Sequence, residues 1–171
     1  RGLGDVYKRQ PNNSFGYGRV DALAAYNAAP TAAAASISGQ VTTAGGTALA
    51  GVTIQMSGEG SRKTITDSNG NYRFDNVDTN KFYTVSPLRL NYHFSPADRS
   101  FSLVGNTTDA TFTATQDTVL SGNVIDTADY FVRQHYLDFL GREPDESGFN
   151  FWSDQILSCG SDSVCRERRT I

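Results

Sequence analysis

Acid and amide side chains alternate in the stretch TDSNGNYRFDNV (residues 66–77), and this spacing could bind calcium. In a helix-flanked calcium loop the ligands occupy positions one, three and five, glycine occupies position six, and a glutamate binds from position twelve. Counted from Asp67, the amides fit positions three and five, but Gly70 falls at position four and Asp78 at position twelve. Asn-Gly is instead the favoured pair for a two-residue β-hairpin turn with positive φ at both centres. The pattern therefore favours a hairpin turn at Asn69 and Gly70 over a metal site.

The two histidines of the chain do not form a recognisable catalytic or metal-binding pattern. Nucleophilic catalysis needs a nucleophile, a base within hydrogen-bond reach and an orienting acid. His93 lies in a strand-like run, His135 lies in a helix-like run, and no Gly-Thr-Ser-Met-like nucleophile segment is present. His135 has no second histidine or carboxylate cluster at ligand spacing, which favours a packed or surface histidine. We therefore expect no catalytic residue, no metal ligand and no cofactor.

Composition restricts the partners. The chain has 171 residues and a formal net charge of -3. Binding of nucleic acid requires a basic face that neutralises phosphates, so we expect no nucleic-acid partner. No apolar run approaches the ~18–20 residues of a membrane-spanning helix, so we expect no membrane span.

The first 36 residues divide into three stretches. Residues 1–13 are interpreted as an artefact or a disordered end, because RGLGDVYKRQ resembles translated sequencing-adapter read-through of metagenomic fragments. Val20, Leu23 and Ala24 recur at helical spacing, which predicts a helix within residues 14–29. Pro30 then begins a linker, residues 30–36.

This helix resembles the closing segment of the subtilisin-like serine peptidase catalytic domain. The matching residues are Gly16, Gly18, Arg19, Val20, Asp21 and Ala22. The resemblance implies the tail of a peptidase domain whose catalytic serine lies earlier in the chain. The alternative is an ordinary alanine-rich helix.

Residues 37–116 carry the period-2 alternation of β-strands. About seven short alternating runs lie between Gly, Asn and Pro turns: ISGQVTT, GVTIQMS, NYRF, FYTVS, NYHFS, SFSLV and DATFTA. This pattern predicts a small seven-stranded antiparallel β-sandwich, flanked by the N-terminal helix and by a C-terminal helical segment. The chain as a whole is thus expected to be multidomain, β plus α.

The same region resembles the carboxypeptidase regulatory-like, transthyretin-type family. The matching residues are Gly39, Gly51, Val52, Thr66, Asp67, Gly70, Tyr72, Phe74, Val77, Tyr83 and the run YHFSP at 92–96. The resemblance implies a noncatalytic prealbumin-like or Ig-like sandwich used as a spacer, stabiliser or adhesive module. Some related adhesin domains form a Lys–Asn isopeptide bond, but Lys63 and Lys81 follow the first strands and the last strand contains no asparagine.

Two helices are predicted after a second linker, residues 117–125. In residues 126–171, Asp126 or Thr127 begins a helix that runs to about Leu140, with an apolar stripe at helical spacing. Asp145 is the expected N-cap of a second helix. Its expected apolar face is Phe149, Trp152 and Ile156.

Residues 131–156 resemble a bacterial domain family of unknown function that occurs near the C-termini of secreted and surface proteins. The signature YxxxLGRxPDxxGxxFW is matched by Tyr136, Leu140, Gly141, Arg142, Pro144, Asp145, Gly148, Phe151 and Trp152. We expect Gly148 to cost ~1 kcal/mol relative to alanine, which close packing against the preceding helix could offset.

The two cysteines, Cys159 and Cys165, lie six residues apart in CGSDSVC. An even count in an exported protein predicts a disulfide. Zinc is a rival, although C-x5-C without nearby histidines is not a usual zinc spacing. Reduced, buried thiols are the other alternative.

These observations predict a noncatalytic accessory portion of a secreted or surface-attached bacterial multidomain protein, downstream of a subtilisin-like peptidase domain. The alternative is a fragment of a surface adhesin or structural protein, with carbohydrate as a candidate ligand and no peptidase upstream. Protein or carbohydrate surfaces are the candidate partners, and the expected location is extracellular or on the cell surface.

Overall fold

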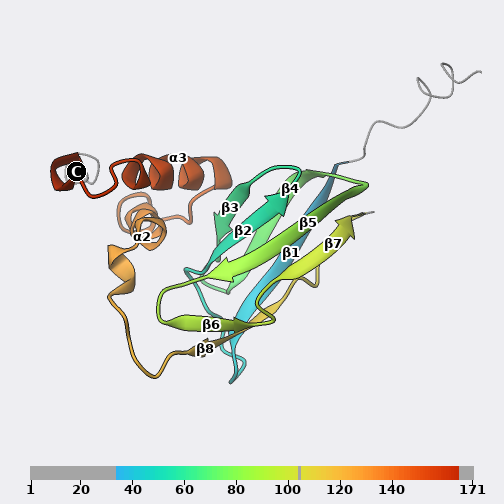
Figure 1. Cartoon of the computed structure of the whole chain (residues 1–171), viewed down its shortest axis with the longest axis horizontal. Coiled ribbons are helices and arrows are strands. Elements are labelled where there is room, and N and C mark those ends of the chain that lie inside the picture. Colours follow the sequence, from blue (N-terminus) through green and yellow to red (C-terminus); the bar gives the residue numbers. More distant parts are fainter. Residues whose placement is uncertain (1–33, 104, 166–171) are drawn as a thin grey trace, which may run out of the picture. The chain divides into compact units, whose positions relative to one another are not determined.

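The computed structural model describes residues 34–103 and 105–165, all within the second of the two units, residues 1–31 and 32–171, into which the chain divides. The predicted peptidase-like helix at 14–29 and the start of the predicted linker lie outside the described residues. The described part consists of two β-sheets followed by a short helical segment (Figure 1).

Eight strands form two four-stranded sheets. Their bounds are β1 Ala34–Thr43, β2 Thr53–Gly58, β3 Arg62–Ile65, β4 Asn71–Asp78, β5 Lys81–Leu88, β6 Tyr92–Ser95, β7 Arg99–Leu103 and β8 Phe112–Gln116. One sheet has the order β4-β1-β8-β6 and the other has the order β3-β2-β5-β7. Seven strands were predicted from the alternating runs, and the additional strand is β3. Its sequence RKTI begins with two charged residues, so it lacks the alternation that marks the other strands.

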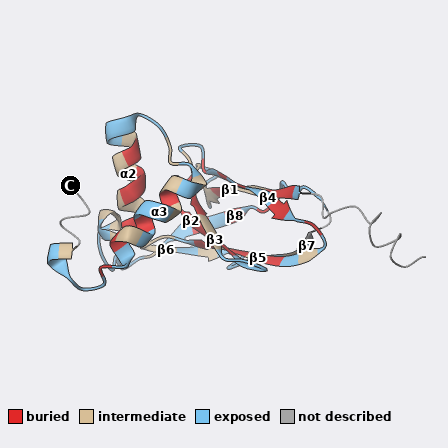
Figure 2. Ribbon diagram, turned by 90° about the horizontal axis from the view of Figure 1, so that it is seen from above, coloured by how far each residue is buried: buried red, intermediate tan, exposed pale blue. Residues whose placement is uncertain are grey.

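The sandwich core is formed by strands of both sheets, and Figure 2 marks buried residues on each of the two layers. The largest fully buried side chains of the core include Phe74, Phe112, Ile37 and Ile54. Phe74 and Phe112 alternate with exposed residues along their strands, as in the eBeBeeBe pattern of β4. Burying each such side chain stabilises the fold by about 1.5–3 kcal/mol. The period-2 prediction therefore identified the inward face of these strands correctly.

The prediction of a wholly antiparallel sandwich is wrong, because β1 and β8 pair in parallel, with Val41 opposite Phe112. Alternation shows which face a strand buries, but it carries no information on the direction of the neighbouring strand. The predicted linker at 30–36 is also corrected, since β1 begins at Ala34. Ala35 pairs with Val77, and the Ser36 amide donates to Asn106 Oδ1 at 3.0 Å. Partners distant in sequence thus draw an alanine-rich stretch into the sheet.

The segment that could have been a calcium loop is a tight turn, although it is not the predicted hairpin. Asp67 Oδ1 accepts from the amides of Asn69 (2.9 Å) and Asn71 (2.8 Å), and the Gly70 amide donates to the Asp67 carbonyl. The predicted turn requires a positive φ at both central residues. Gly70 has a φ of +72°, but the φ of Asn69 is not positive. The flanking strands β3 and β4 belong to different sheets. The turn therefore carries the chain from one sheet to the other.

The helical segment contains η1 (Val124–Asp126), α2 (Ala128–Leu140) and α3 (Glu146–Leu157). Thr127 is the N-cap of α2, and Gly141 ends this helix in the left-handed conformation. Asp145 is the N-cap of α3, and its side chain accepts from the Gly148 amide. The predicted linker at 117–125 thus ends inside η1. None of the helices in the described ranges is long and apolar enough to cross a membrane.

The predicted buried faces of the two helices need correction. On α3 the buried residues are Phe149, Ser153 and Ile156, whereas Trp152 is 46% exposed. On α2 the stripe predicted from spacing is buried at Ala128, Val132 and Tyr136 but exposed at its end. Among the residues that the structure describes, each helix buries one side against the sandwich and the other helix and exposes the rest.

Candidate functional site

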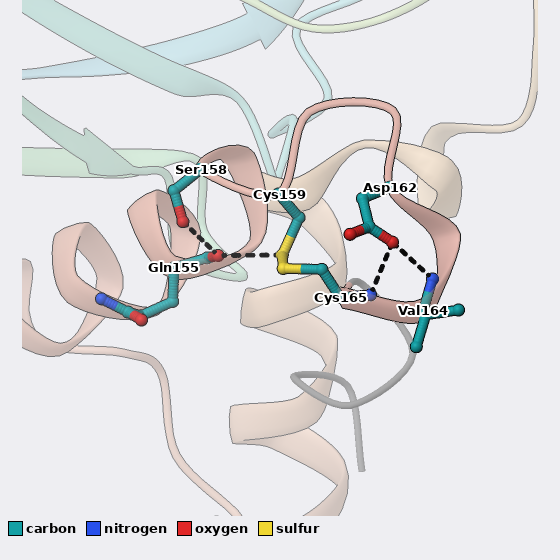
Figure 3. Close-up of a disulfide and its surroundings, with 6 residues drawn as sticks. All are labelled: Gln155, Ser158, Cys159, Asp162, Val164 and Cys165. Carbon is teal, nitrogen blue, oxygen red and sulfur yellow. Dashed lines mark hydrogen bonds between the residues drawn. A yellow bond between two sulfur atoms is a disulfide. The ribbon is translucent and has the colours of Figure 1, made fainter.

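The predicted disulfide joins Cys159 and Cys165, with Cα atoms 5.5 Å apart (Figure 3). The bridge closes a bend after α3, in which Gly160 has a φ of +56°. Asp162 Oδ1 accepts from the amides of Val164 (3.0 Å) and Cys165 (3.1 Å) and so begins a new helical turn. The disulfide therefore fixes the direction in which the chain leaves α3.

The two histidines lie in separate places. His93 Nδ1 lies 2.9 Å from Asp117 Oδ1 on the sandwich surface, where both side chains are exposed. His135 Nδ1 lies 3.2 Å from the carbonyl of Phe131, one turn earlier on α2. Within the described residues no serine or threonine hydroxyl is hydrogen-bonded to either ring, and no group of three or more His, Cys, Asp or Glu is arranged to hold a metal.

The most elaborate constellation of charged side chains lies where β3 meets the helices. Arg62 forms two hydrogen bonds to Glu146, each 2.6 Å long, and this pairing raises the pKa of the arginine. Lys63 Nζ lies 3.1 Å from Asp129 Oδ1 and 3.3 Å from Asp154 Oδ1. One short strand thus holds carboxylates from both α2 and α3, and we call these five residues the β3 junction.

Lys63 is the centre of the β3 junction. Its side chain is only 17% exposed, and its ammonium lies 5.6 Å from the centroid of the Phe149 ring. Asn150 Nδ2 donates to the Lys63 carbonyl at 2.9 Å, so the backbone of β3 is held as well. Thr53 on β2 donates to the second oxygen of Asp129 at 3.0 Å. A mostly buried ammonium beside two carboxylates is a stronger constraint than a surface ion pair.

Apolar packing completes the contact between the sandwich and the helices. Ile65 at the end of β3 leaves the sandwich core and joins the cluster of Ala128, Val132, Tyr136, Phe149 and Ile156, with Phe131 packed beside it. Near the start of α2, a side chain at Gly51 would collide with the Tyr130 ring, which also lies under the Arg89 guanidinium. Gly51 has φ of +71°, so both its backbone conformation and this close approach favour glycine.

A corner between α2 and α3 brings together several residues of the sequence signature. The Arg142 guanidinium lies 5.0 Å from the centroid of the Tyr136 ring and 3.2 Å from Asp145 Oδ1. Hydrogen bonds from Ser147, from the Gly148 amide and from Arg142 lower the pKa of Asp145. Gly148 lies against the Tyr136 hydroxyl, so the close packing expected at this glycine is present.

An open polar groove of about 560 Å³ lies next to the β3 junction. Its lining comes from β1, β3, β4 and the α2–α3 connection and includes Ser38, Gln40, Asn71, Arg73 and Glu143. Glu143 is already paired with the buried Arg133. The groove offers hydrogen-bonding groups but no activated nucleophile.

Sequence reasoning missed the β3 junction. Arg62 and Lys63 stand in a strand that was not predicted, and no role was predicted for Asp129, Glu146 or Asp154. The available signal in the sequence was the pair of adjacent basic residues, Arg62 and Lys63, directly before the β-branched residues Thr64 and Ile65.

Comparisons with known families agree with this division. Residues 36–115 match the carboxypeptidase regulatory-like domain, and residues 116–163 match a domain of unknown function, DUF4214. The resemblance inferred for residues 37–116 is thereby confirmed. Neither match includes residues 14–29, so the resemblance to a peptidase tail receives no support from them.

Solved structures give weaker likenesses, and a search of curated proteins found no match. The TIE protein of Bacillus anthracis is 15% identical with a TM-score of 0.43, and the match covers 48% of this chain and 16% of that one. GBS52, the minor pilin of Streptococcus agalactiae, is 14% identical with a TM-score of 0.43, with coverages of 54% and 49%. The chain thus spans less than half of either protein. Likeness at this level does not establish a shared fold.

Proposed function

We propose that residues 34–165 form a noncatalytic accessory unit, a rigid spacer or adhesive part of an extracellular or cell-surface protein. The match to the carboxypeptidase regulatory-like domain supports the noncatalytic role. The Cys159–Cys165 bridge supports the location, because disulfides persist in oxidising compartments outside the cytosol.

The β3 junction is the observation that carries this proposal. A flexible tether between two domains needs few contacts across the boundary. Here Lys63, with its two carboxylates, and the bidentate Arg62–Glu146 pair fasten the helices to an edge strand of the sandwich. The helices also cover that edge and so protect it from pairing with other chains. The arrangement suits a part that transmits position or force between its neighbours.

The parent protein is a separate part of the proposal. We infer a subtilisin-like peptidase domain upstream from the run at Gly16 to Ala22, which lies outside the described residues. A surface adhesin or structural protein is the alternative parent. The coding sequence upstream of Gly16 discriminates between them, since a nucleophile serine segment is expected there only in the first case.

Lys63→Met tests the rigid unit. Methionine retains most of the apolar stem but removes the ammonium that pairs with Asp129 and Asp154, and we expect a loss of about 2 kcal/mol in the free energy of unfolding. Trp152, the single tryptophan, reports on the helices by fluorescence, and amide hydrogen exchange in β1 and β5 reports on the sandwich. In the wild type both are expected to unfold together. In the variant the helices should open at a lower denaturant concentration than the sandwich.

Lys81→Met is the matched control, because Lys81 is a more exposed lysine on β5 that pairs with Glu59 and not with a helix residue. It should leave both probes unchanged. Independent unfolding of helices and sandwich in the wild type would refute the rigid unit. Hydrolysis of casein by the pure chain, sensitive to a serine-peptidase inhibitor, would refute the noncatalytic role.

A further inference from the structure

The chain enters the sandwich through β1 and leaves it through β8, and these two strands run side by side in the same direction. In the sheet order β4-β1-β8-β6, β1 pairs with β8, and Val41 lies opposite Phe112 in a parallel register. The chain therefore enters at the Ala34 end of this pair and leaves at Gln116, which lies beyond the last residue of β1. Figure 1 shows β1 beginning at one end of the sandwich and β8 leading out at the other.

The direction of β8 decides how tension along the chain acts on the sheet. When the entry and exit strands are parallel neighbours, a pull on the chain makes them slide past each other, and the hydrogen bonds between them share the load. When they are antiparallel neighbours, the chain enters and leaves at the same end, and the same pull opens the hydrogen bonds one after another. The parallel pairing of β1 and β8 places this sandwich in the first class.

Backbone hydrogen bonds also join β1 to the segment that precedes β8. The Thr107 amide donates to the Ser36 carbonyl at 2.8 Å, and the Ser38 amide donates to the Thr107 carbonyl at 2.8 Å. The Ala110 amide donates to the Ser38 carbonyl at 3.2 Å, and the parallel ladder then continues along residues 41–43. The contact thus extends along nearly the whole of β1, and we call β1 together with residues 107–116 the terminal clamp.

The side chains of the terminal clamp oppose the same sliding motion. Ile37, Val41 and Phe112 are buried in the sandwich core, so sliding would drag them past closely packed neighbours. Gly39 lies so close to Ala110 that a Cβ at Gly39 would overlap the Ala110 carbonyl oxygen. Ala110 is itself fully buried, and a hydrogen bond away from water is stronger than an exposed one. Hydrogen bonds and packing therefore resist the same displacement.

We propose that the sandwich is a load-bearing link, in which the terminal clamp resists tension along the chain. Tension from the N-terminal side reaches β1 at Ala34. Tension from the C-terminal side reaches β8 at Gln116, once the contacts between the helices and β3 have opened. The inference rests on the spacer role proposed above and adds to it a resistance to force along one direction.

Single-molecule pulling on the full chain tests the terminal clamp in two geometries. Handles are attached through azide-bearing residues at positions 34 and 116 in the first geometry and at positions 34 and 78 in the second, all of which are exposed. Ala34 lies opposite Asp78 in the antiparallel β1–β4 pair, so the second pull opens that pair from its end. At one loading rate we expect the rupture force of the first geometry to be at least about twice that of the second, because its hydrogen bonds must fail together. Equal forces, or a weaker first geometry, overturn the proposal.

Thr107→Pro removes the amide that donates to Ser36, so it should lower the rupture force in the first geometry and leave the second unchanged. Thr107→Ala is the matched control, because it keeps the amide, and it should behave like the wild type in both geometries. Far-UV circular dichroism checks the fold of each variant, and if the proline variant does not fold, the comparison of the two geometries in the wild type decides.

A folded Thr107→Pro protein that keeps the wild-type force in the first geometry, or that is weakened equally in both, also overturns the proposal. The helices lie outside the path of both pulls. Independent unfolding of helices and sandwich, which would refute the rigid unit, therefore leaves the result for the terminal clamp unaffected.

Discussion

Gly148→Ala should destabilise the protein, although alanine is the better helix former. Gly148 is the third residue of α3, after Glu146 and Ser147. In an exposed helix interior the change from glycine to alanine stabilises by about 1 kcal/mol, and a first-turn position benefits by no more than this. Helix propensity by itself therefore predicts a variant that is slightly more stable than the wild type.

Packing opposes this gain. A Cβ at position 148 would overlap the Tyr136 hydroxyl oxygen, with Tyr136 Cζ 3.2 Å away and Asp145 Oδ1 3.3 Å away. The tyrosine cannot easily yield, because its ring is buried in the helical core under the Arg142 guanidinium. Overpacking of this kind costs about 1–3 kcal/mol, and the direct overlap points to the upper end. We expect a net loss of about 2 kcal/mol in the free energy of unfolding.

A double-mutant cycle separates the two effects. Tyr136→Phe removes the oxygen that the new methyl group would meet, so Gly148→Ala should cost about 2 kcal/mol less in that background. Urea denaturation followed by Trp152 fluorescence measures all four proteins, and an unchanged m-value shows that the unfolded states are comparable. A Gly148→Ala protein that is more stable than the wild type, or a cycle with no coupling, would show that the contact with Tyr136 does not decide this position.

Three further predictions concern the turn, the helix cap and the cysteines. Millimolar calcium should leave the melting temperature unchanged, because Asp67 Oδ1 already accepts from two amides, and a rise of several degrees would contradict this. Asp145→Ala should cost about 1 kcal/mol. Because the pKa of Asp145 is lowered in the folded state, its contribution is complete above its ordinary pKa and is lost as the pH falls through the folded value. The wild type and Asp145→Ala should therefore converge in stability in acid, and a constant difference between them would argue against the cap. Thiol titration of denatured, unreduced protein from an oxidising compartment should find no free thiol, and two free thiols would exclude the Cys159–Cys165 bridge.

Local sequence patterns determined much of this protein. The alternation in β4 and β5 placed Tyr72, Phe74, Tyr83 and Val85 on the buried face, and the structure buries all four. Asp145 before an apolar helical stretch marked the start of α3, because an N-cap acts on amides within three residues. These features depend on neighbours in the chain, so the sequence contains their whole cause.

Tertiary structure decided the features that depend on distant partners. β3 is a strand because β2 lies beside it and carboxylates from α2 and α3 reach Arg62 and Lys63, which no local pattern records. The parallel pairing of β1 and β8 joins residues about seventy positions apart. Trp152 has the spacing of a core residue, yet it is 46% exposed, because it lies to one side of the buried face formed by Phe149, Ser153 and Ile156. Periodicity states which side of an element is apolar, and only the assembled fold states whether anything covers it.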